Sequence, residues 1–246
     1  MNFFSQDKNK YLLSIEGNIG AGKSTFLKKL SENFKEAEVI FEPHHQWQNI
    51  EGHNLLETFY KDTKRWAYSF ENYAFLTRVK EIENSFQKNY DKSLFFAERS
   101  VYADYYTFVK VLYQTSQIND LEWNMYKNWH LWLTKKYVKK IDAFIYLKVS
   151  PEICYQRIQK RNRSEEENIP LEYLKTLDIC HNEWLIEKKY NEYDIESTPV
   201  LVLNGEIDFE NNHNLLNKLI NEIKNFIDKK TDYFMFNKHY ENNINI

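Results

Sequence analysis

Five short apolar segments alternate with longer amphipathic segments along the chain. The apolar segments are YLLSIE (11–16), EVIFE (38–42), SLFFAE (93–98), DAFIYLKV (142–149) and PVLVLNG (199–205). Their apolar residues follow one another directly instead of alternating with polar ones, which is typical of strands buried on both faces. The pattern therefore predicts an α/β fold in which a parallel sheet carries helices on both faces.

The residues that follow these segments are the first candidates for chemistry, because ligands of parallel α/β sheets gather at the carboxyl ends of the strands. The five ends read Glu16–Gly17, Glu42–Pro43, Glu98–Arg99, Ser150–Pro151 and Asn204–Gly205.

The length favours one sizeable domain. The 246 residues are 42% hydrophobic and 17% aromatic, which is enough to bury a large core. By composition, only the segment KKTDYFMFNKHYENNINI (229–246) looks detachable. We predict a domain over residues 1–228 and a C-terminal tail over 229–246, either a loose end or a partner-binding segment.

Charge and cysteine content exclude several classes of protein. With 33 basic and 36 acidic residues the net charge is −3, so nothing global attracts nucleic acid or an anionic membrane. The two cysteines, Cys154 and Cys180, form neither a metal pattern nor a disulfide framework. No apolar run is long enough to span a bilayer. We expect a soluble, cytoplasmic protein without nucleic-acid or membrane partners.

The segment GNIGAGKS (17–24) fits the phosphate-loop pattern G-x-x-x-x-G-K-[ST] between a predicted strand and a predicted helix. In such a loop, backbone N–H groups surround the phosphates, a lysine neutralises them and a hydroxyl can ligate Mg²⁺. An ordinary glycine-rich turn is the alternative. The predicted ATP-binding residues here are Gly17, Asn18, Ile19, Gly20, Ala21, Gly22, Lys23, Ser24 and Thr25, with Lys23 also catalytic.

Two acidic strand ends suggest phosphoryl transfer to an alcohol. Glu42 could serve as general base for an acceptor hydroxyl, or it could be a structural acid that satisfies a loop amide. Glu98 could join Ser24 in holding Mg²⁺, and Arg99 could bridge the transferring group and Glu42. A buried ion pair is the alternative for Glu98 and Arg99.

The polar segment RIQKRNRSEE (157–166) could close over ATP as a short arginine-rich lid. On composition alone, a solvated charged helix is the favoured interpretation.

The order of these segments resembles the deoxynucleoside kinase family. The matching pieces, from about Tyr11 to Asp208, are GNIGAGKST, FEP with Trp47 shortly after it, NLLETFYKD, FENYAFLTR, ERSVYADYYTF and RNRSEEENIPLEYL. The resemblance implies a P-loop kinase with a five-stranded parallel sheet flanked by helices. It also implies ATP and Mg²⁺ as cofactors, a deoxynucleoside as substrate, and a homodimer formed through a helical bundle.

The resemblance implies roles for individual positions. Glu42 matches the general base for the 5′-hydroxyl with Arg99 beside it, and Tyr60 and Glu166 match positions that hold the sugar 3′-hydroxyl. Arg161 and Arg163 match lid residues that contact phosphate, whereas Arg157, Asp208 and Phe209 match the surroundings of the adenine of ATP. The base would be lined by Trp47, Leu56, Phe70 and Phe108; without the family, the three aromatic side chains among them would be expected in the core.

One position departs from the family. Glu71 stands where the family usually has glutamine, whereas Arg78 and Asp104 match an ion pair of its deoxycytidine and deoxyguanosine kinases. Glu71 and Arg78 are spaced to share one helical face. We expect Glu71 and Arg78 to contact the base and favour deoxyguanosine, with deoxyadenosine or deoxycytidine as alternatives. A non-catalytic nucleotide-binding subunit of a kinase heterodimer, or a nucleoside monophosphate kinase, would be competing functions.

Overall fold

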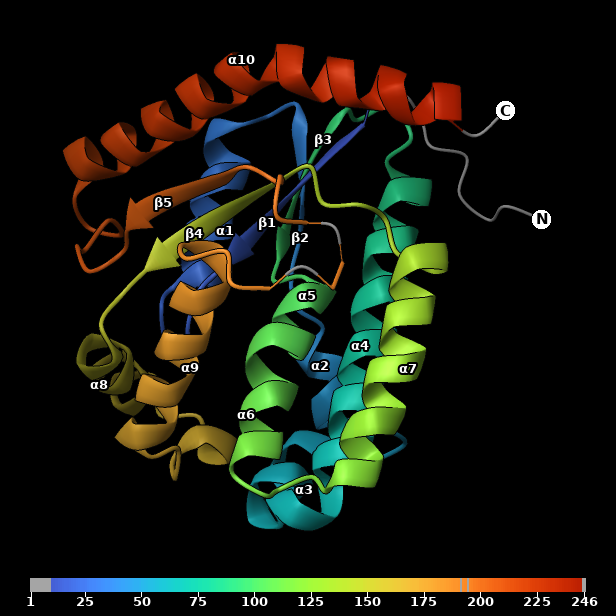
Figure 1. The fold of residues 1–246 in the computed structure, drawn as a ribbon. Helices are drawn as coiled ribbons and strands as arrows, with labels where there is room; N and C mark the ends of the chain where they lie inside the picture. The colour runs from blue at the N-terminus through green and yellow to red at the C-terminus, as the bar shows by residue number, and fades with distance from the viewer. Residues whose placement is uncertain (1–9, 191, 194, 245–246) are drawn as a thin grey trace.

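The computed structural model describes residues 10–190, 192–193 and 195–244, with side chains as far as residue 229. Its centre is a five-stranded sheet in which all four neighbouring pairs are parallel and the strand order is β2-β3-β1-β4-β5 (Figure 1). The strands are β1 (Tyr11–Glu16), β2 (Ala37–Ile40), β3 (Leu94–Glu98), β4 (Ala143–Lys148) and β5 (Val200–Asn204).

Helices fill the connections between the strands, and one more helix, α10, follows the last strand. They are α1 (Lys23–Asn33), α2 (His44–Gln48), α3 (Leu55–Lys61), α4 (Thr63–Lys88), α5 (Val101–Ala103), the π-helical turn η1 (Asp104–Val109), α6 (Lys110–Gln114), α7 (Asp120–Tyr137), α8 (Pro151–Arg161), the 3₁₀ turn η2 (Ser164–Glu166), α9 (Leu171–Leu185) and α10 (His213–Ile244).

Both faces of the sheet are buried. Successive strand residues point to opposite faces, so Leu12 packs with helices α4 and α7, whereas Leu13 packs with α1 and α10. The pairs Phe95 with Phe96 and Phe144 with Ile145 divide between the two cores in the same way. This arrangement explains the continuous apolar runs in the sequence and confirms the predicted fold class.

The strands are one or two residues shorter than predicted in four of the five segments. Strand β2 ends at Ile40, so Phe41, Glu42 and Pro43 belong to the loop that follows it. Strand β2 is at the edge of the sheet, and Pro43 has no N–H to extend the pairing. Glu42 therefore leaves the sheet and becomes free to turn toward the phosphate loop.

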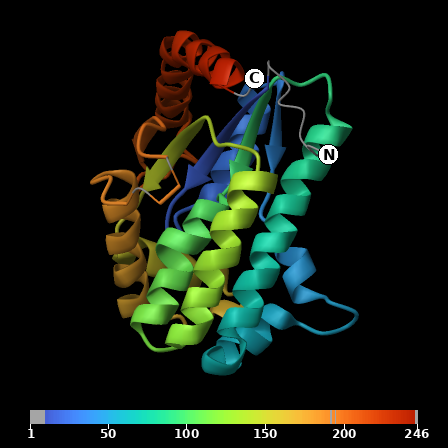
Figure 2. The same cartoon turned by 45° about the vertical axis from the view of Figure 1, so that its right-hand side comes forward.

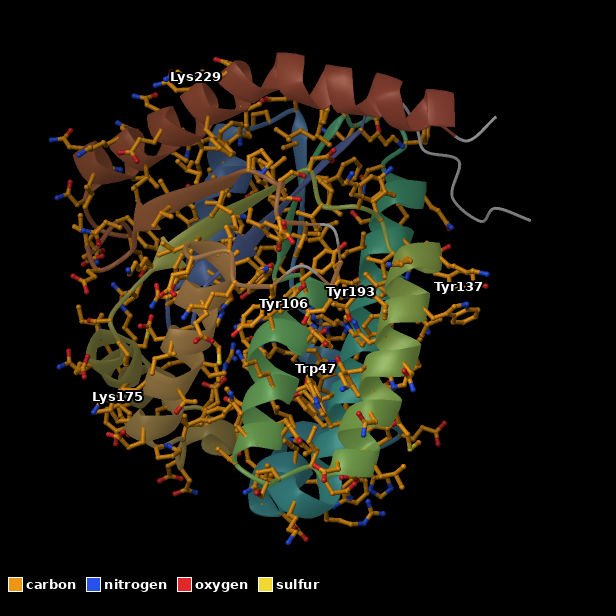
Figure 3. The ribbon with its side chains drawn as sticks, viewed as in Figure 1. Trp47, Tyr106, Tyr137, Lys175, Tyr193 and Lys229 are labelled. Carbon is orange, nitrogen blue, oxygen red and sulfur yellow. The ribbon has the colours of Figure 1, made fainter. Side chains whose placement is uncertain are left out.

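Helices α4, α5, η1, α6 and α7 cover one face of the sheet as a bundle of roughly parallel axes (Figure 2). Helix α4 buries Glu71, Ala74, Phe75 and Arg78, so the predicted helical face is confirmed. The aromatic side chains between these helices include Trp47, Tyr106 and Tyr193 (Figure 3). The bundle thus brings a carboxylate and a guanidinium of α4 into the interior of the domain.

Helix α10 lies across the opposite side of the sheet from this bundle (Figure 1). It continues through Asp228 and Lys229 to Ile244 without a break, and the side chains beyond Lys229 lie outside the described residues. The division into a domain over 1–228 and a tail over 229–246 therefore stays a prediction. In the part of the chain that the structure describes, none of the helices is both long and apolar enough to cross a bilayer.

Candidate active site

The phosphate loop joins β1 to α1 in the predicted position. Gly20 and Gly22 have φ values of +78° and +94°, which side chains rarely tolerate. A Cβ atom at Gly20 would lie 2.5 Å from the Cys154 carbonyl oxygen, so the loop also requires glycine for space. Lys23 donates from Nζ to the Asn18 carbonyl at 2.9 Å, which turns the ammonium group back over the loop.

Burial lowers the pKa of Lys23 to about 8, and nearby Arg99 acts in the same direction. A bound phosphate would reverse this effect because it favours the charged form. The loop therefore has the backbone and the cation that a polyphosphate needs.

A cavity of about 260 Å³ opens beside the loop at the carboxyl ends of β1, β2 and β3. All residues predicted to bind nucleoside line it, together with six phosphate-loop residues, Glu98 and two lid arginines. The predicted residues in its wall are Ile19, Gly20, Gly22, Lys23, Ser24, Thr25, Glu42, Trp47, Leu56, Tyr60, Phe70, Glu71, Arg78, Glu98, Arg99, Asp104, Phe108, Arg161, Arg163 and Glu166.

Glu42 is the centre of a buried ionic network. Arg78 donates through Nη2 to Glu42 and through Nη1 to both oxygens of Asp104, and Arg99 Nε lies 3.3 Å from Glu42. Burial disfavours the ionised form of Glu42, but the surrounding cations, Arg99 foremost, hold its pKa below the ordinary value. Glu42 is thus a carboxylate ready to accept a hydrogen bond from a substrate hydroxyl.

The ion pair of Arg78 with Asp104 matches the prediction, whereas the link from Arg78 to Glu42 was not predicted. It joins residues 36 positions apart that come from α4 and from the loop after β2. Burial raises the pKa of Asp104 to about 6, although Arg78 opposes the shift. A single guanidinium therefore connects the candidate general base with the deeper part of the cavity.

Arg99 adopts a left-handed backbone conformation, with φ of +67°, directly after β3. Non-glycine residues are rarely found there, and such strain is concentrated at functional sites. The guanidinium donates to the Gly17 carbonyl at 3.1 Å and lies over the Phe108 ring, 4.5 Å from its centroid. These contacts fix Arg99 between the phosphate loop and Glu42.

The residues predicted to hold a metal ion lie together. Ser24 donates from Oγ to Glu98 Oε1 at 2.6 Å. Hydroxyl and carboxylate oxygens fit Mg²⁺, which usually binds through one or two protein groups plus phosphates and water. Among the described side chains, no three His, Cys, Asp or Glu residues form a complete metal site. The pair therefore fits Mg²⁺ that arrives with a nucleotide.

Aromatic side chains form one wall of the cavity. Trp47 is fixed by donation from Nε1 to Thr77 Oγ1 at 2.9 Å, and its ring meets Phe70 edge-on at 5.5 Å. Phe70 in turn stacks on Phe59 at 4.5 Å. The wall offers flat apolar faces of the kind on which a nucleobase packs.

Glu71 is buried in the same wall, with 3% of its surface exposed. None of the residues that the structure describes forms a hydrogen bond or ion pair with its side chain. Burial, reinforced by the Asp104 carboxylate, raises the pKa of Glu71 well above its ordinary value. The Glu71 carboxyl group therefore lacks a hydrogen-bond donor among the described residues, and the sequence predicts that it contacts the nucleobase.

The lid segment consists of the end of α8, a left-handed turn at Asn162 and η2. Arg161 and Arg163 both contact Glu166, the second of them at 3.3 Å. Glu166 and Tyr60 both line the cavity, and burial followed by the Glu166 charge raises the pKa of Tyr60. Both arginines line the cavity and are about one third exposed, while the lid, sugar and phosphate roles of the segment stay predictions.

Several predicted phosphate-side residues lie outside the cavity wall. Asn18 donates from Nδ2 to the Leu174 carbonyl at 2.8 Å and so connects the phosphate loop to α9. The backbone carbonyls of Gly17 and Ala21 accept hydrogen bonds from Arg99 and Arg157. Arg157 donates to the Ala21 and Gly205 carbonyls at 3.1 and 3.0 Å.

Comparison with known proteins decides the family. The family model described as deoxynucleoside kinase matches residues 13–228. A probable deoxycytidine kinase of Fowlpox virus is 42% identical over 215 residues, which is 87% of each chain. The mitochondrial deoxyguanosine kinase of Xenopus laevis is 38% identical over 236 residues, covering 87% of this chain and 89% of its own. Human deoxycytidine kinase is 35% identical over 237 residues, covering 87% and 90%.

The chain belongs to the deoxynucleoside kinase family. The resemblance inferred from the ordered motifs is therefore confirmed, and with it phosphotransferase activity on deoxynucleosides. The relatives are named as deoxycytidine and deoxyguanosine kinases, so membership alone leaves the preferred base of this deoxynucleoside kinase open.

Of the residues predicted to surround the adenine of ATP, Arg157 and Phe209 lie next to Gly22 of the phosphate loop. A Cβ atom at Gly22 would lie 3.3 Å from the Phe209 ring and 3.8 Å from Arg157 Nη1. Phe209 is buried against Phe26, whereas Asp208 is at the surface and bonds to Asn211. The adenine role of these residues stays a prediction.

Sequence reasoning missed five residues that line the cavity: Lys28, His44, Phe59, Ala74 and Tyr173. His44 Nε2 lies 3.4 Å from Glu42, and its ring meets Trp47 at 5.1 Å. Its place two residues after Glu42 was the available signal. Tyr173 lies in α9, inside the matched segment RNRSEEENIPLEYL, and its place in that segment was the available signal for it.

Proposed function

We propose that this kinase transfers the γ-phosphoryl group of ATP to the 5′-hydroxyl of a purine deoxynucleoside, with deoxyguanosine preferred. The observation that carries the base preference is the buried, unpartnered carboxylate of Glu71 in the wall of the cavity. A buried acceptor left without donors costs affinity, so the best ligand is one that supplies them.

Guanine supplies two donors side by side, N1–H and N2–H₂, which match the two oxygens of an ionised Glu71. Adenine and cytosine present an unprotonated ring nitrogen at the corresponding edge and would face the carboxylate with a lone pair. Arg78 would then donate to guanine O6 or N7, which requires that its contact with Glu42 loosens as the nucleoside enters.

The positions of the remaining groups support the proposed reaction. Glu42 accepts the proton of the 5′-hydroxyl, and Arg99, fixed over Phe108, stabilises the negative charge on the transferring group. Lys23 and the lid residues Arg161 and Arg163 neutralise the phosphates. Tyr60 and Glu166 hold the sugar 3′-hydroxyl.

ATP and Mg²⁺ fit the groups that remain. The glycine backbone of the phosphate loop and Lys23 would hold the phosphates of ATP, and Ser24 and Glu98 would hold Mg²⁺. The ion, when bound, neutralises charge on the phosphate oxygens. The cytoplasmic location expected from the sequence stays a prediction, since a relative is named mitochondrial.

The test compares kcat/KM for the four natural deoxynucleosides, with ATP and Mg²⁺ at pH 8, between the parent and Glu71→Gln. We expect deoxyguanosine to be the best substrate of the parent and to lose roughly 10- to 100-fold of its advantage in the variant, the discrimination typical of one bidentate base contact. Glu83→Gln, on the exposed part of the same helix, is the matched control and should behave as the parent.

A parent that prefers deoxycytidine or thymidine, or a Glu71→Gln variant with undiminished guanine preference, would contradict the base assignment. Absence of phosphorylation with any deoxynucleoside would contradict the proposed reaction itself.

We further propose that the kinase is a homodimer formed through α4 and α7. Leu76 of α4 and Leu121, Met125 and Trp132 of α7 are large apolar side chains with about half or more of their surface exposed. The two helices lie side by side in the bundle (Figure 2), and a second copy would cover both helices at once.

A further inference from the structure

Among the described residues, the part of the cavity around Glu71 contains three carboxylates but only two guanidinium groups. The buried carboxylates of Glu71 and Asp104, and that of Glu42 with its side chain 8% exposed, line the cavity together with the buried guanidinium groups of Arg78 and Arg99. Arg78 donates to Glu42 and Asp104, and Arg99 lies against Glu42. Both arginines are thus engaged by the other two acids, and Glu71 is left without a cation in contact.

We propose that Glu71 is a proton-linked selector of the base: it carries a proton in the empty cavity, releases it when guanine binds, and keeps it when adenine or cytosine binds. This inference rests on the proposed function, because it requires that Glu71 faces the base of a deoxynucleoside.

The two protonation states of Glu71 match different base edges. An ionised carboxylate has two acceptor oxygens, which match the N1–H and N2–H₂ donors of guanine. A neutral carboxyl group has one donor and one acceptor, which match N1 and N6–H₂ of adenine or N3 and N4–H₂ of cytosine. The proton that leaves Glu71 on guanine binding passes to solvent, and no covalent bond changes.

The surroundings of Glu71 favour this group over Asp104 as the proton carrier. Asp104 accepts two hydrogen bonds from Arg78, which stabilise its ionised form, whereas Glu71 accepts none from the described residues. Burial and the Asp104 charge raise the pKa of Glu71 well above its ordinary value, in agreement with the geometry.

The titratable and charged groups around Glu71 come from seven elements of the structure. They are Arg78 of α4, Asp104 of η1, Arg99 after β3, Glu42 after β2, Tyr60 of α3, Tyr126 of α7 and Tyr173 of α9. Burial raises the pKa of all three tyrosines, so they stay neutral near pH 7. The arginines stay charged at any usable pH.

The experiment measures kcat/KM for deoxyguanosine, deoxyadenosine and deoxycytidine from pH 6.0 to 8.5. If guanine requires ionised Glu71 and adenine requires the neutral form, the deoxyguanosine-to-deoxyadenosine ratio rises by about tenfold per pH unit. This slope is independent of the actual pKa of Glu71. The titration of Lys23, with a pKa of about 8, affects both substrates alike and cancels in the ratio.

Glu71→Gln is the matched variant, because its amide resembles the neutral carboxyl group but cannot titrate. We expect its ratio to be constant with pH and to favour deoxyadenosine or deoxycytidine. A ratio in the parent that does not change with pH would overturn the proposal, and so would a slope that persists in Glu71→Gln, since another group would then be titrating.

Calorimetry on the parent gives a measurement that does not depend on a variant that folds. Binding is measured in two buffers of different ionisation enthalpy, without a phosphate donor. The deoxyguanosine complex should contain one proton fewer than the deoxyadenosine or deoxycytidine complex; equal proton uptake would refute the proposal. If the parent prefers deoxyguanosine but its deoxyguanosine-to-deoxyadenosine ratio does not change with pH, the proton-linked role of Glu71 is refuted and the proposed function stands. If the parent prefers a pyrimidine deoxynucleoside and the ratio still rises about tenfold per pH unit, only the preference for guanine is refuted.

Discussion

Glu42→Gln separates the proposed base catalysis from binding. The Glu42 side chain is 8% exposed and touches Arg78, Arg99 and His44, so its replacement must keep the volume and one acceptor oxygen. Glutamine does both, because its amide oxygen can accept from Arg78. What it loses is the charge and the capacity to accept a proton from the 5′-hydroxyl.

The size of the effect follows from these contacts. Loss of general-base catalysis alone lowers turnover by about 10²–10⁴-fold. In the variant, Arg78 keeps its hydrogen bonds to both oxygens of Asp104. Arg99 loses its carboxylate partner, Glu42, but keeps its hydrogen bond to the Gly17 carbonyl. We therefore expect the variant to fold and nucleoside affinity to change by less than about tenfold, far less than turnover.

The assay measures single-turnover phosphorylation of a deoxynucleoside with saturating ATP and Mg²⁺, together with nucleoside affinity by calorimetry. Because the surrounding cations hold the pKa of Glu42 below its ordinary value, the parent rate should show no loss of this base between pH 6 and 8. Near-normal turnover in Glu42→Gln, or equal losses in affinity and turnover, would refute the reasoning and leave Glu42 as a structural acid.

Two further predictions concern assembly and stability. Trp132→Glu on α7 should convert a dimer into a monomer in sedimentation velocity. Ile179→Glu on α9, where the side chain is at least as exposed as Trp132, should remain dimeric; a parent that is monomeric at tens of micromolar would contradict the interface. Burial lowers the pKa of His181 from 6.5 to about 3, so the native state loses stability as pH falls from about 6.5 towards 3. His181→Phe, which can keep the stacking on Tyr146, should reduce that slope by about 1.4 kcal/mol per pH unit in denaturant titrations, and an unchanged slope would disprove the assignment.

The sheet and the phosphate side of the site could be predicted from the sequence because their signals are local. Continuous apolar runs mark strands buried on two faces, and the phosphate loop is a contiguous pattern whose glycines have a steric reason at Gly20 and Gly22. The helical face of Glu71 and Arg78 follows from periodicity alone. The end of β2 was predicted two residues late because its position depends on pairing at a sheet edge.

The ionic network could be predicted only in part. Arg78 with Asp104 came from the family resemblance, but the contact of Arg78 with Glu42 depends on how the loop after β2 approaches α4, and no local pattern encodes that approach. His44 was missed although its place two residues after Glu42 was an available signal. The role of Tyr173 depends on where α9 lies against the bundle, which is a property of tertiary packing.

The shared guanidinium of Arg78 gives the site a physical link between base recognition and chemistry. In the empty cavity, Arg78 contacts Glu42, and this contact helps to hold the pKa of Glu42 low and so weakens it as a base. A nucleobase that draws Arg78 towards its own acceptors would break the contact of Arg78 with Glu42. The pKa of Glu42 would then rise, and Glu42 would be a stronger general base when the 5′-hydroxyl arrives. A nucleobase without such acceptors would leave Arg78 in contact with Glu42. Discrimination between bases should therefore appear in kcat as well as in KM, since the interaction that selects the base also prepares the group that removes the proton.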